Sequence, residues 1–161
     1  MTKLFDALKI HFTYDNGLYW VKPTANRVKQ GDRFGHIHSS GHRRGVFLCD
    51  RYYEHKLVWL YHYGVWPKEL DHINRIRDDN RIENLREVTR QQNNFNKCSY
   101  KNSSSKYKGV SWYKNNSKWK AQYVINSKTF HIGYFDDELE AAKAYDNTVR
   151  EVQKEYGKYN V

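Results

Sequence analysis

A short polar segment at residues 71–96 brings together a carboxylate, an imidazole and several Asn amides. Asp71 could hold a hard cation such as Mg²⁺, which takes oxygen ligands. His72 could accept a proton near neutral pH, and Asn84 and Asn93 could orient a base or complete a metal shell. A metal-bound carboxylate beside a neutral imidazole suits phosphodiester hydrolysis, because the metal stabilises the leaving oxygen while the imidazole activates a water.

Each of these residues also has an ordinary structural interpretation. Asp-His dipeptides are common, and Asn-rich segments usually form turns. The spacing of the whole set, rather than any single member, favours chemistry. Neighbouring side chains of a regular strand point to opposite faces, so Asp71 and His72 would flank a phosphate from two sides rather than share one ion.

The segment resembles the HNH nuclease family in its Asp-His pair, its later Asn-Leu-Arg and the Asn on a following helix. The resemblance implies that Asp71 and Asn93 bind magnesium or manganese. It also implies that His72 is the general base and that Asn84 orients the His72 ring. The Asn at position 93 makes the third motif position similar to that of the phage and intron-encoded homing branch of the family.

Two further residues are accessory candidates. His55 lies in His-Lys-Leu-Val-Trp, which is similar to the His-Arg-Leu-Val segment of the homing branch, with Lys56 in place of Arg. By itself, His55 is more typical of a helix surface or a core. Arg86 could bind phosphate or be a solvated strand residue, and both interpretations stay open.

The composition indicates a polyanionic partner. The 161 residues carry a formal net charge of +10, and the pI is about 9.5. Double-stranded DNA is the expected partner. The mean hydropathy of -1.01 and the lack of a long apolar run exclude a spanning helix. The start of the chain has no apolar signal core, which favours a cytoplasmic, unsecreted protein, in a host cell if phage-encoded. We expect a monomer.

The cysteines bear on zinc and on the cellular compartment. Only Cys49 and Cys98 occur, and they form no CxxC motif. The pattern argues against a zinc knuckle, so no structural zinc is expected. Both cysteines are expected to be reduced thiols.

We expect an α+β fold that begins with a β-rich segment over residues 1–50. Its strands are predicted at 4–14, 18–21, 35–38 and 45–49, separated by turns with Asn-Gly or Gly-Asp. Arg43 and Arg44 belong to a basic set in this segment and are predicted to contact DNA.

The nuclease unit is predicted at 51–99. A helix over 54–63 ends at Gly64 and Pro67. Strands at 70–73 and 85–88 flank a polar loop, and Thr89 with Gln92 forms a capping box for a helix of about two turns. Strand, loop, strand and helix is the ββα-metal arrangement that the HNH resemblance implies.

A polar linker is predicted at 100–106, followed by a domain at 107–161. Three strands at 108–113, 119–125 and 128–134 precede a helix over 138–156. Asp137 and Glu140 fit an N-terminal capping box, and Gly157 fits the C-terminal stop. The apolar stripe of the helix is predicted to cover the sheet, and it consists of Ala142, Tyr145, Val149, Val152 and Tyr156.

This last domain resembles the plant ethylene-response-factor DNA-binding domain in Tyr-Lys-Gly-Val at 107–110, Trp-Lys-Ala at 119–121, Gly-Tyr-Phe at 133–135 and Ala-Tyr-Asp at 144–146. The resemblance implies that one sheet face enters the major groove. That face would carry Lys108, Tyr113, Lys114, Trp119, Lys120 and Gln122. Lys replaces the Arg of the plant pattern, so bidentate guanine readout is not expected. The alternative is a solvated basic face with Trp119 in the core.

These patterns favour a metal-dependent endonuclease that cuts double-stranded DNA and resembles the homing branch. A non-catalytic, sequence-dependent DNA-binding regulator is the alternative. An RNA-directed protein finds no support, because the aromatic residues do not follow an RNA-recognition pattern.

Overall fold

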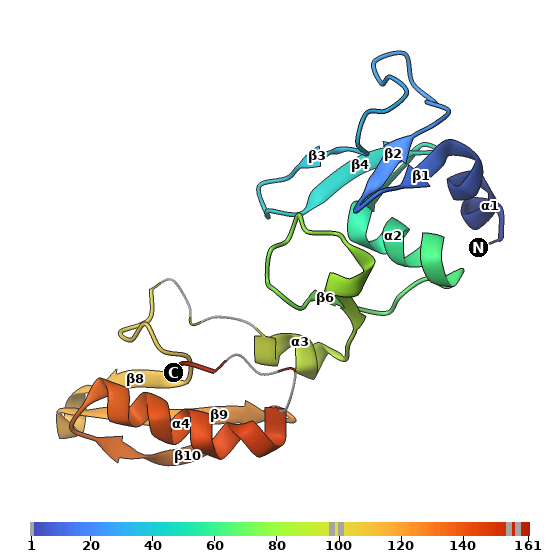
Figure 1. The fold of residues 1–161 in the computed structure, drawn as a ribbon. Coiled ribbons are helices and arrows are strands. Elements are labelled where there is room, and N and C mark those ends of the chain that lie inside the picture. Colours follow the sequence, from blue (N-terminus) through green and yellow to red (C-terminus); the bar gives the residue numbers. More distant parts are fainter. Residues whose placement is uncertain (1, 97–98, 100–101, 154–155, 157–158) are drawn as a thin grey trace. The chain divides into compact units, whose positions relative to one another are not determined.

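The computed structural model describes residues 2–96, 99, 102–153, 156 and 159–161 (Figure 1). The chain divides into two compact units, one ending at Val88 and the other beginning at Thr89. Both units mix helices with antiparallel strands, which confirms the α+β class. Among the described residues, no helix is both long and apolar enough to cross a membrane.

The first unit contains three small antiparallel sheets and two helices. Strands β1 and β2 form one sheet, β3, β4 and β5 the second, and β6 and β7 the third. In chain order the elements are α1 (Thr2–His11), β1 (Phe12–Tyr14), β2 (Leu18–Trp20), β3 (His36–Ile37), β4 (Arg43–Phe47), β5 (Asp50–Tyr53), α2 (Glu54–Tyr63), β6 (Leu70–His72), a 3-10 turn η1 (Ile82–Asn84) and β7 (Leu85–Glu87).

The strand predicted at 4–14 is wrong over most of its length, because α1 takes its place as far as His11. Leu4 and Leu8 lie one helical turn apart, and both contact the core of the unit. Leu8 is fully buried. The core therefore selects a helix here, and only the last three residues of the predicted strand form β1.

Aromatic side chains from three strands and from the loop before β3 fill the centre of this core. The Phe12 ring lies 4.1 Å from the ring of Trp20, 5.6 Å from that of Phe34 and 5.1 Å from that of Phe47, between centroids. Helix α2 packs Leu57, Val58 and Leu60 into the same cluster.

Helix α2 ends where the sequence predicts. Gly64 adopts a left-handed conformation with φ of 70°, and its N–H donates to the carbonyl of Leu60. The predicted capping box at the start of α3 (Arg90–Asn96) also forms. The Thr89 N–H donates to Gln92 Oε1 at 2.8 Å, and the Gln92 N–H donates to Thr89 Oγ1 at 3.2 Å.

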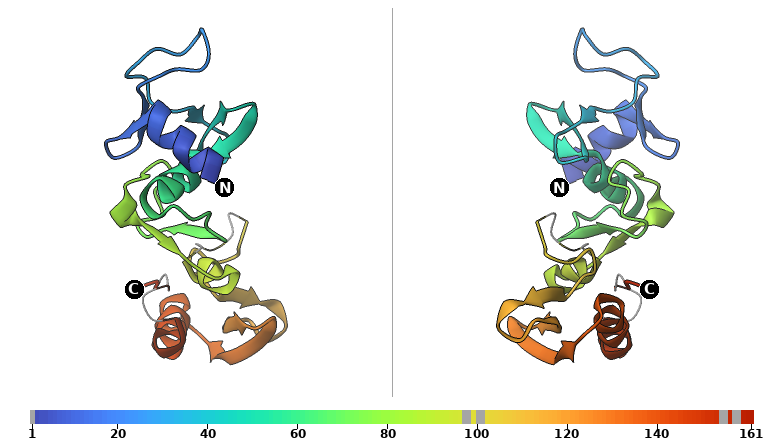
Figure 2. Two further views of the ribbon diagram at one scale, coloured as in Figure 1. Left: turned by 90° about the vertical axis from the view of Figure 1, so that its right-hand side faces the viewer. Right: turned by 90° about the vertical axis from the view of Figure 1, so that its left-hand side faces the viewer.

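The second unit is a three-stranded antiparallel sheet covered on one face by a helix (Figures 1 and 2). Strand β9 lies between β8 and β10. A 3-10 turn, η2, connects β8 to β9. The elements after α3 are β8 (Val110–Tyr113), η2 (Lys114–Asn116), β9 (Lys118–Ile125), β10 (Lys128–Phe135) and α4 (Glu138–Gln153).

Helix α4 begins as predicted, because Asp137 Oδ1 accepts the N–H groups of Leu139 and Glu140. Of its predicted stripe, Ala142, Tyr145 and Val149 are buried, whereas Val152 is 41% exposed. The stripe therefore packs against the sheet through Ala142, Tyr145 and Val149, whereas Tyr156 follows the end of α4 at Gln153. Gly157, the predicted stop, lies outside the described residues, as do Cys98 and the first two linker positions.

Gly109 shows why the Tyr-Lys-Gly-Val motif needs its glycine. The residue has a φ of +76°, and a Cβ there would collide with the Tyr145 ring of α4. A side chain at this position would thus meet both backbone strain and a buried aromatic ring.

Candidate functional site

Asp71 lies at the centre of β6 and forms an ion pair across the hairpin. It is directly opposite Arg86 of β7, whose Nε and Nη2 atoms donate to Asp71 Oδ2 at 3.1 and 2.9 Å. Asp71 is buried. Arg86 is therefore a partner of the candidate metal-binding carboxylate, and a cation bound there would share that carboxylate with a guanidinium.

His72 ends β6, and its ring contacts a residue from the loop that follows. The Nε2 atom lies 2.8 Å from Asn80 Oδ1, while the Asn80 amide donates to Glu54 Oε2 at 2.6 Å. Because the Glu54 carboxylate can only accept, Asn80 must present its oxygen to the ring. His72 Nε2 then carries the proton, and Nδ1 holds the lone pair.

The contact expected between Asn84 and the His72 ring does not form among the described residues. The Asn84 amide instead donates to Asn74 Oδ1 at 2.9 Å and to the Asp79 carbonyl at 2.8 Å. Its Oδ1 accepts the Asn74 N–H at 2.9 Å. Asn84 thus ties together the loop between β6 and β7, and the loop delivers Asn80 to His72.

A buried charge network lies behind Asn80. Glu54 is fully buried and accepts Arg33 Nη2 at 2.8 Å, with Arg43 Nε at 3.8 Å. Arg43 also donates to both carboxylate oxygens of Asp78 at 2.9 and 3.1 Å. Arg43, predicted to contact DNA, is engaged by these carboxylates, and its DNA contact stays a prediction.

Burial keeps the imidazoles of this region neutral. Burial lowers the pKa of His72, an effect that its hydrogen bond to Asn80 opposes. His55, at the start of α2, has its pKa lowered to about 2, first by burial and then by the neighbouring imidazoles of His72 and His42. A neutral His72 is in the protonation state that a general base needs.

Asp71 and His72 occupy opposite faces of the hairpin, as the alternation of a strand requires. Asp71 meets Arg86, and His72 meets Asn80. A carboxylate oxygen and an amide oxygen are donors that suit a hard cation, so Asp71 and Asn93 fit a magnesium or manganese site in their chemistry. Asn93 lies on α3 in the second unit, and its partnership with Asp71 stays a prediction.

Sequence reasoning missed Glu54, Asn80 and His42. Asn80 lies in the predicted loop between two strands, where nothing in the local sequence distinguishes it from the other polar residues. Glu54 carried one local signal, because it is an acidic residue directly before His55 in a predicted helix rich in apolar residues.

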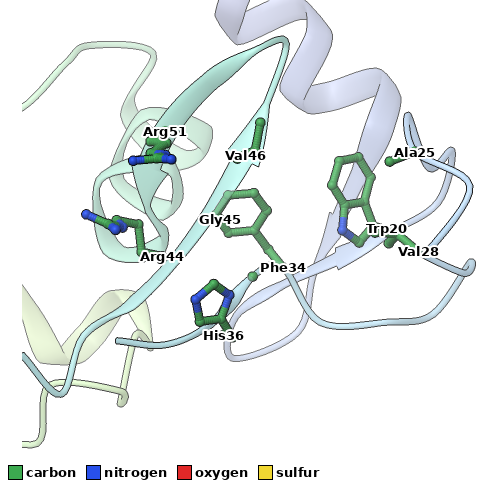
Figure 3. Close-up of a pocket in the computed structure, with 10 residues that line it drawn as sticks. Trp20, Ala25, Val28, Phe34, His36, Arg44, Gly45, Val46 and Arg51 are labelled. Atoms are coloured by element: carbon green, nitrogen blue, oxygen red, sulfur yellow. The ribbon is translucent and has the colours of Figure 1, made fainter. Parts of the chain in front are cut away.

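Arg44 lines a cavity of about 480 Å³ in the first unit (Figure 3). His36 and Arg51 stand with it on one side, while Trp20 and Val28 stand on the other. The prediction that Arg44 contacts DNA is compatible with this position, because cationic groups gather at the cavity.

The sheet of the second unit has one face toward α4 and one face away from it. Ala121 and Val110 pair across β8 and β9, and both are buried in the core with α4. Trp119 lies two residues before Ala121 on the same side and packs against this core. Trp119 therefore does not lie on the outer face with Lys120, and it packs against the core, as the alternative placed it.

The outer face carries Lys120 and Gln122, which alternate with the buried residues of β9. Tyr113 joins them from β8, and its ring lies 5.7 Å from Lys120 Nζ. The Tyr113 ring is also 5.3 Å from the Tyr134 ring of β10. Lys114 is exposed at the end of β8. These residues form a mixed basic and aromatic surface, called here the outer face.

Lys108 does not belong to this outer face. Its ammonium donates to the carbonyl oxygens of Asn94, at 3.2 Å, and Phe95. Both carbonyls lie in the last turn of α3, so Lys108 caps that helix. The expectation that Lys108 is solvent-facing is wrong.

The HNH endonuclease family model matches residues 52–95, and the AP2 domain model matches residues 105–155. The chain has an HNH endonuclease domain followed by an AP2 domain. No curated protein and no solved structure matches it. The AP2 match agrees with the expected ethylene-response-factor type of DNA-binding domain.

The HNH match extends from β5 to α3 and includes His55, Asp71, His72, Asn84 and Asn93. The division into compact units falls within this match. His42, whose ring lies 5.4 Å from the ring of His72, precedes the match. His72 therefore has a neighbouring imidazole from outside the HNH match.

The two domains indicate a nuclease that acts on DNA. HNH nucleases use divalent metals, and the assignment of Asp71 and Asn93 as metal ligands stays a prediction. The AP2 match contains the whole outer face. The segment at 100–106, predicted as a linker, lies between the two matches up to residue 104 and within the AP2 match at 105–106. Its boundaries stay predictions.

Proposed function

We propose that this protein is a magnesium- or manganese-dependent endonuclease that hydrolyses phosphodiester bonds in double-stranded DNA, in the manner of homing endonucleases. The observation that carries the proposal is the orientation of His72. Its Nε2 is engaged by Asn80, so the lone pair of the neutral ring is on Nδ1, which we assign as the proton acceptor. This imidazole stands next to Asp71, within the HNH match.

His72 acts as the general base. Its Nδ1 takes a proton from the water that attacks phosphorus, and the ring becomes positively charged. The Asn80 oxygen accepts the Nε2–H and keeps the ring in place, while the Glu54 carboxylate behind Asn80 favours that positive charge. Asn84 is a positioning residue, because it holds the loop that carries Asn80.

Asp71 and Asn93 would hold the divalent cation. When bound, the cation supplies charge stabilisation for the leaving 3′ oxygen. Arg86 keeps the Asp71 carboxylate oriented and, in a complex with DNA, could bind the same phosphate. One carboxylate and one amide are few ligands, so DNA phosphate and waters are expected to complete the shell.

The AP2 domain is proposed to place the nuclease on duplex DNA. Lys120 and Gln122 on the sheet, with Lys114 at its edge, would contact the backbone and base edges. Lys binds phosphate as a point charge, so this surface contributes affinity more than guanine readout. The charge run without acidic residues from Val88 to Phe135 agrees with this role.

One observation favours a second candidate, a non-catalytic DNA-binding regulator. Asp71 and His72 are 6% and 5% exposed, and Asp71 is already neutralised by Arg86. A site built only to hold a scaffold together would have these properties. Cleavage of DNA by the unaltered protein distinguishes the two candidates.

The test compares cleavage of duplex DNA, single-stranded DNA and RNA, each with magnesium and with EDTA. The proposal expects magnesium-dependent cleavage of duplex DNA that His72→Ala abolishes. Duplex binding without cleavage by the unaltered protein would favour the regulator. Homing itself is tested by cleavage of a candidate locus that lacks the intron, compared with the same locus after insertion.

A further inference from the structure

Three histidines from separate segments of the first unit meet around the end of β6. His42 lies before β4, His55 on α2 and His72 on β6, and their candidate ligand nitrogens all lie within 4.8 Å of one another. The ring centroids are separated by 5.0 Å for His42 and His55, 5.4 Å for His42 and His72, and 5.2 Å for His55 and His72. These three residues are called here the histidine cluster.

Two nitrogens of the cluster are buried without a partner. Among the described residues, Nδ1 of His42 and Nδ1 of His55 make no hydrogen bond. The His55 side chain is also deeply buried, with only 7% of its surface exposed. An unsatisfied buried polar atom is destabilising. Such atoms in a native fold call for an explanation, and an absent ligand is one.

The cluster is held in the state in which imidazoles bind metals. Burial is the first cause that lowers the pKa of His42, to about 4, and the pKa of His55, to about 2. The imidazoles are therefore neutral at neutral pH, and each can present a lone pair. The His72 ring is further oriented by Asn80 and, through it, by Glu54. A carboxylate behind a histidine ligand is the usual support of a metal site.

We propose that His42, His55 and His72 form a binding site for a borderline divalent transition cation such as Zn²⁺ or Co²⁺, and that its occupation withdraws His72 from proton transfer. Three imidazoles suit such cations, whereas Mg²⁺ prefers oxygen ligands. With metal–nitrogen distances of about 2.0–2.1 Å, each imidazole would move by less than about 1 Å. Water or a DNA phosphate would take the fourth position.

The regulatory half of this proposal rests on the proposed function of His72 as general base. The Nδ1 lone pair that would accept a proton is the one that a cation would engage, because Nε2 is committed to Asn80. Cation binding and proton transfer are then mutually exclusive. Transition cations at the cluster would therefore inhibit the nuclease, whereas magnesium at Asp71 would activate it.

Binding is tested first, by a measurement that does not need nuclease activity. Metal-stripped full-length protein is titrated with Co²⁺, and the visible absorption of a tetrahedral nitrogen-ligated ion is recorded before and after Zn²⁺ is added. The unaltered protein should give these bands at one equivalent, and Zn²⁺ should remove them. His42→Ala should weaken binding by at least about tenfold, since one of three protein ligands is lost.

His36→Ala is the matched control, because His36 is an exposed histidine of the same unit outside the cluster. It should bind Co²⁺ as the unaltered protein does. His55→Ala could unfold the core, so His42→Ala, whose residue lies nearer the surface, decides the site, with circular dichroism confirming that it folds. The absence of tetrahedral bands, or equal Co²⁺ affinity in His42→Ala and the unaltered protein, would overturn the site.

Inhibition is tested second, with Zn²⁺ added to the protein in excess magnesium. Cleavage by the unaltered protein should fall at the Zn²⁺ concentration that displaces Co²⁺, and His42→Ala, normalised to its own metal-stripped rate with magnesium, should need at least about tenfold more. Binding without inhibition would overturn the regulatory half. A protein that never cleaves DNA would instead overturn the proposed nuclease, and the Co²⁺ titration would still decide the site.

Discussion

The Nε2 atom of His72 lies 2.8 Å from the Oδ1 atom of Asn80. Asn80 in turn donates to a fully buried Glu54, so the direction of this contact is set by a carboxylate that can only accept. A residue of the β6–β7 loop therefore decides which nitrogen of the candidate general base carries the proton.

Asn80→Ala should lower the cleavage rate by about 10- to 100-fold, because His72 loses the partner that holds its ring and its tautomer. KM for DNA should change little, since Asn80 is buried and does not face solvent. Single-turnover kinetics measures the rate, with Asn147→Ala on the exposed side of α4 as control. Equal rates for Asn80→Ala and the control would remove Asn80 from its positioning role.

His72→Ala should abolish detectable cleavage while DNA affinity stays nearly unchanged. Loss of a general base typically costs about 100- to 10,000-fold in rate. Single-turnover cleavage and a gel-shift titration on the same DNA separate the two quantities. A variant that cleaves at nearly the original rate would assign the base to another residue.

Asp71→Ala should remove the response of cleavage to magnesium or manganese. Without DNA, the unaltered protein should bind magnesium weakly by calorimetry, because one carboxylate and one amide leave most of the shell to DNA and water. Arg86 would lose its ion-pair partner in this variant, so thermal unfolding must be recorded beside the kinetics. Full activity in EDTA contradicts metal dependence.

Glu54→Gln should destabilise the first unit by roughly 3 kcal/mol, because it removes the buried charge that Arg33 and Arg43 share and leaves Asp78 as the carboxylate of both. Denaturant unfolding measures the change. Glu83→Gln, an exposed residue of the same unit, is the control and should stay within about 0.5 kcal/mol. A similar free energy of unfolding for the two variants would mean that Glu54 does not anchor this network.

Lys114→Ala combined with Lys120→Ala should weaken DNA binding and flatten its salt dependence. Each phosphate contact contributes about 0.9 to the slope of log affinity against log salt, so the slope should fall by about 1.8 if both lysines contact phosphate. Lys143→Ala on α4 is the control, since its residue is exposed and α4 covers the other face of the sheet. Equal slopes for the double variant and this control would exclude the outer face from the DNA contact.

Removal of the AP2 domain tests whether this domain supplies much of the DNA affinity. A chain that ends near residue 100 should retain the catalytic residues but bind its DNA site more weakly and with a smaller salt slope. Lys108 would be lost with the domain, and with it the cap on the last turn of α3. Helical content must therefore be measured by circular dichroism before any loss of affinity is assigned to DNA contacts.

Local signals in the sequence determined much of this fold. Helix α2 ends at Gly64, α3 begins at the Thr89–Gln92 capping box and α4 begins at Asp137. Each of these features depends on residues within about four positions of one another, so the sequence alone contains it. The Asp-His pair and the later Asn residues were likewise identified from their spacing.

Tertiary structure decided which of those residues touch. Helix α1 forms in place of the predicted strand because one side of the helix packs against the aromatic core. Segments that are distant in the sequence build that core. Trp119 lies on the same side of β9 as the buried Ala121, and the alternation of a strand already separates it from Lys120. Which of these two sides α4 covers, and the contact of Lys108 with α3, depend on packing between segments that local patterns do not specify.

The contacts of His72 show the same limit most clearly. Asn80 follows it by eight residues, whereas Glu54 precedes Asn80 by twenty-six, and His42 comes from before the HNH match. Local spacing determined the identity of the candidate base, since Asp-His is a contiguous pattern. Only the folded chain could determine its tautomer, its burial and its neighbouring imidazoles, because those depend on segments that meet when the core excludes water.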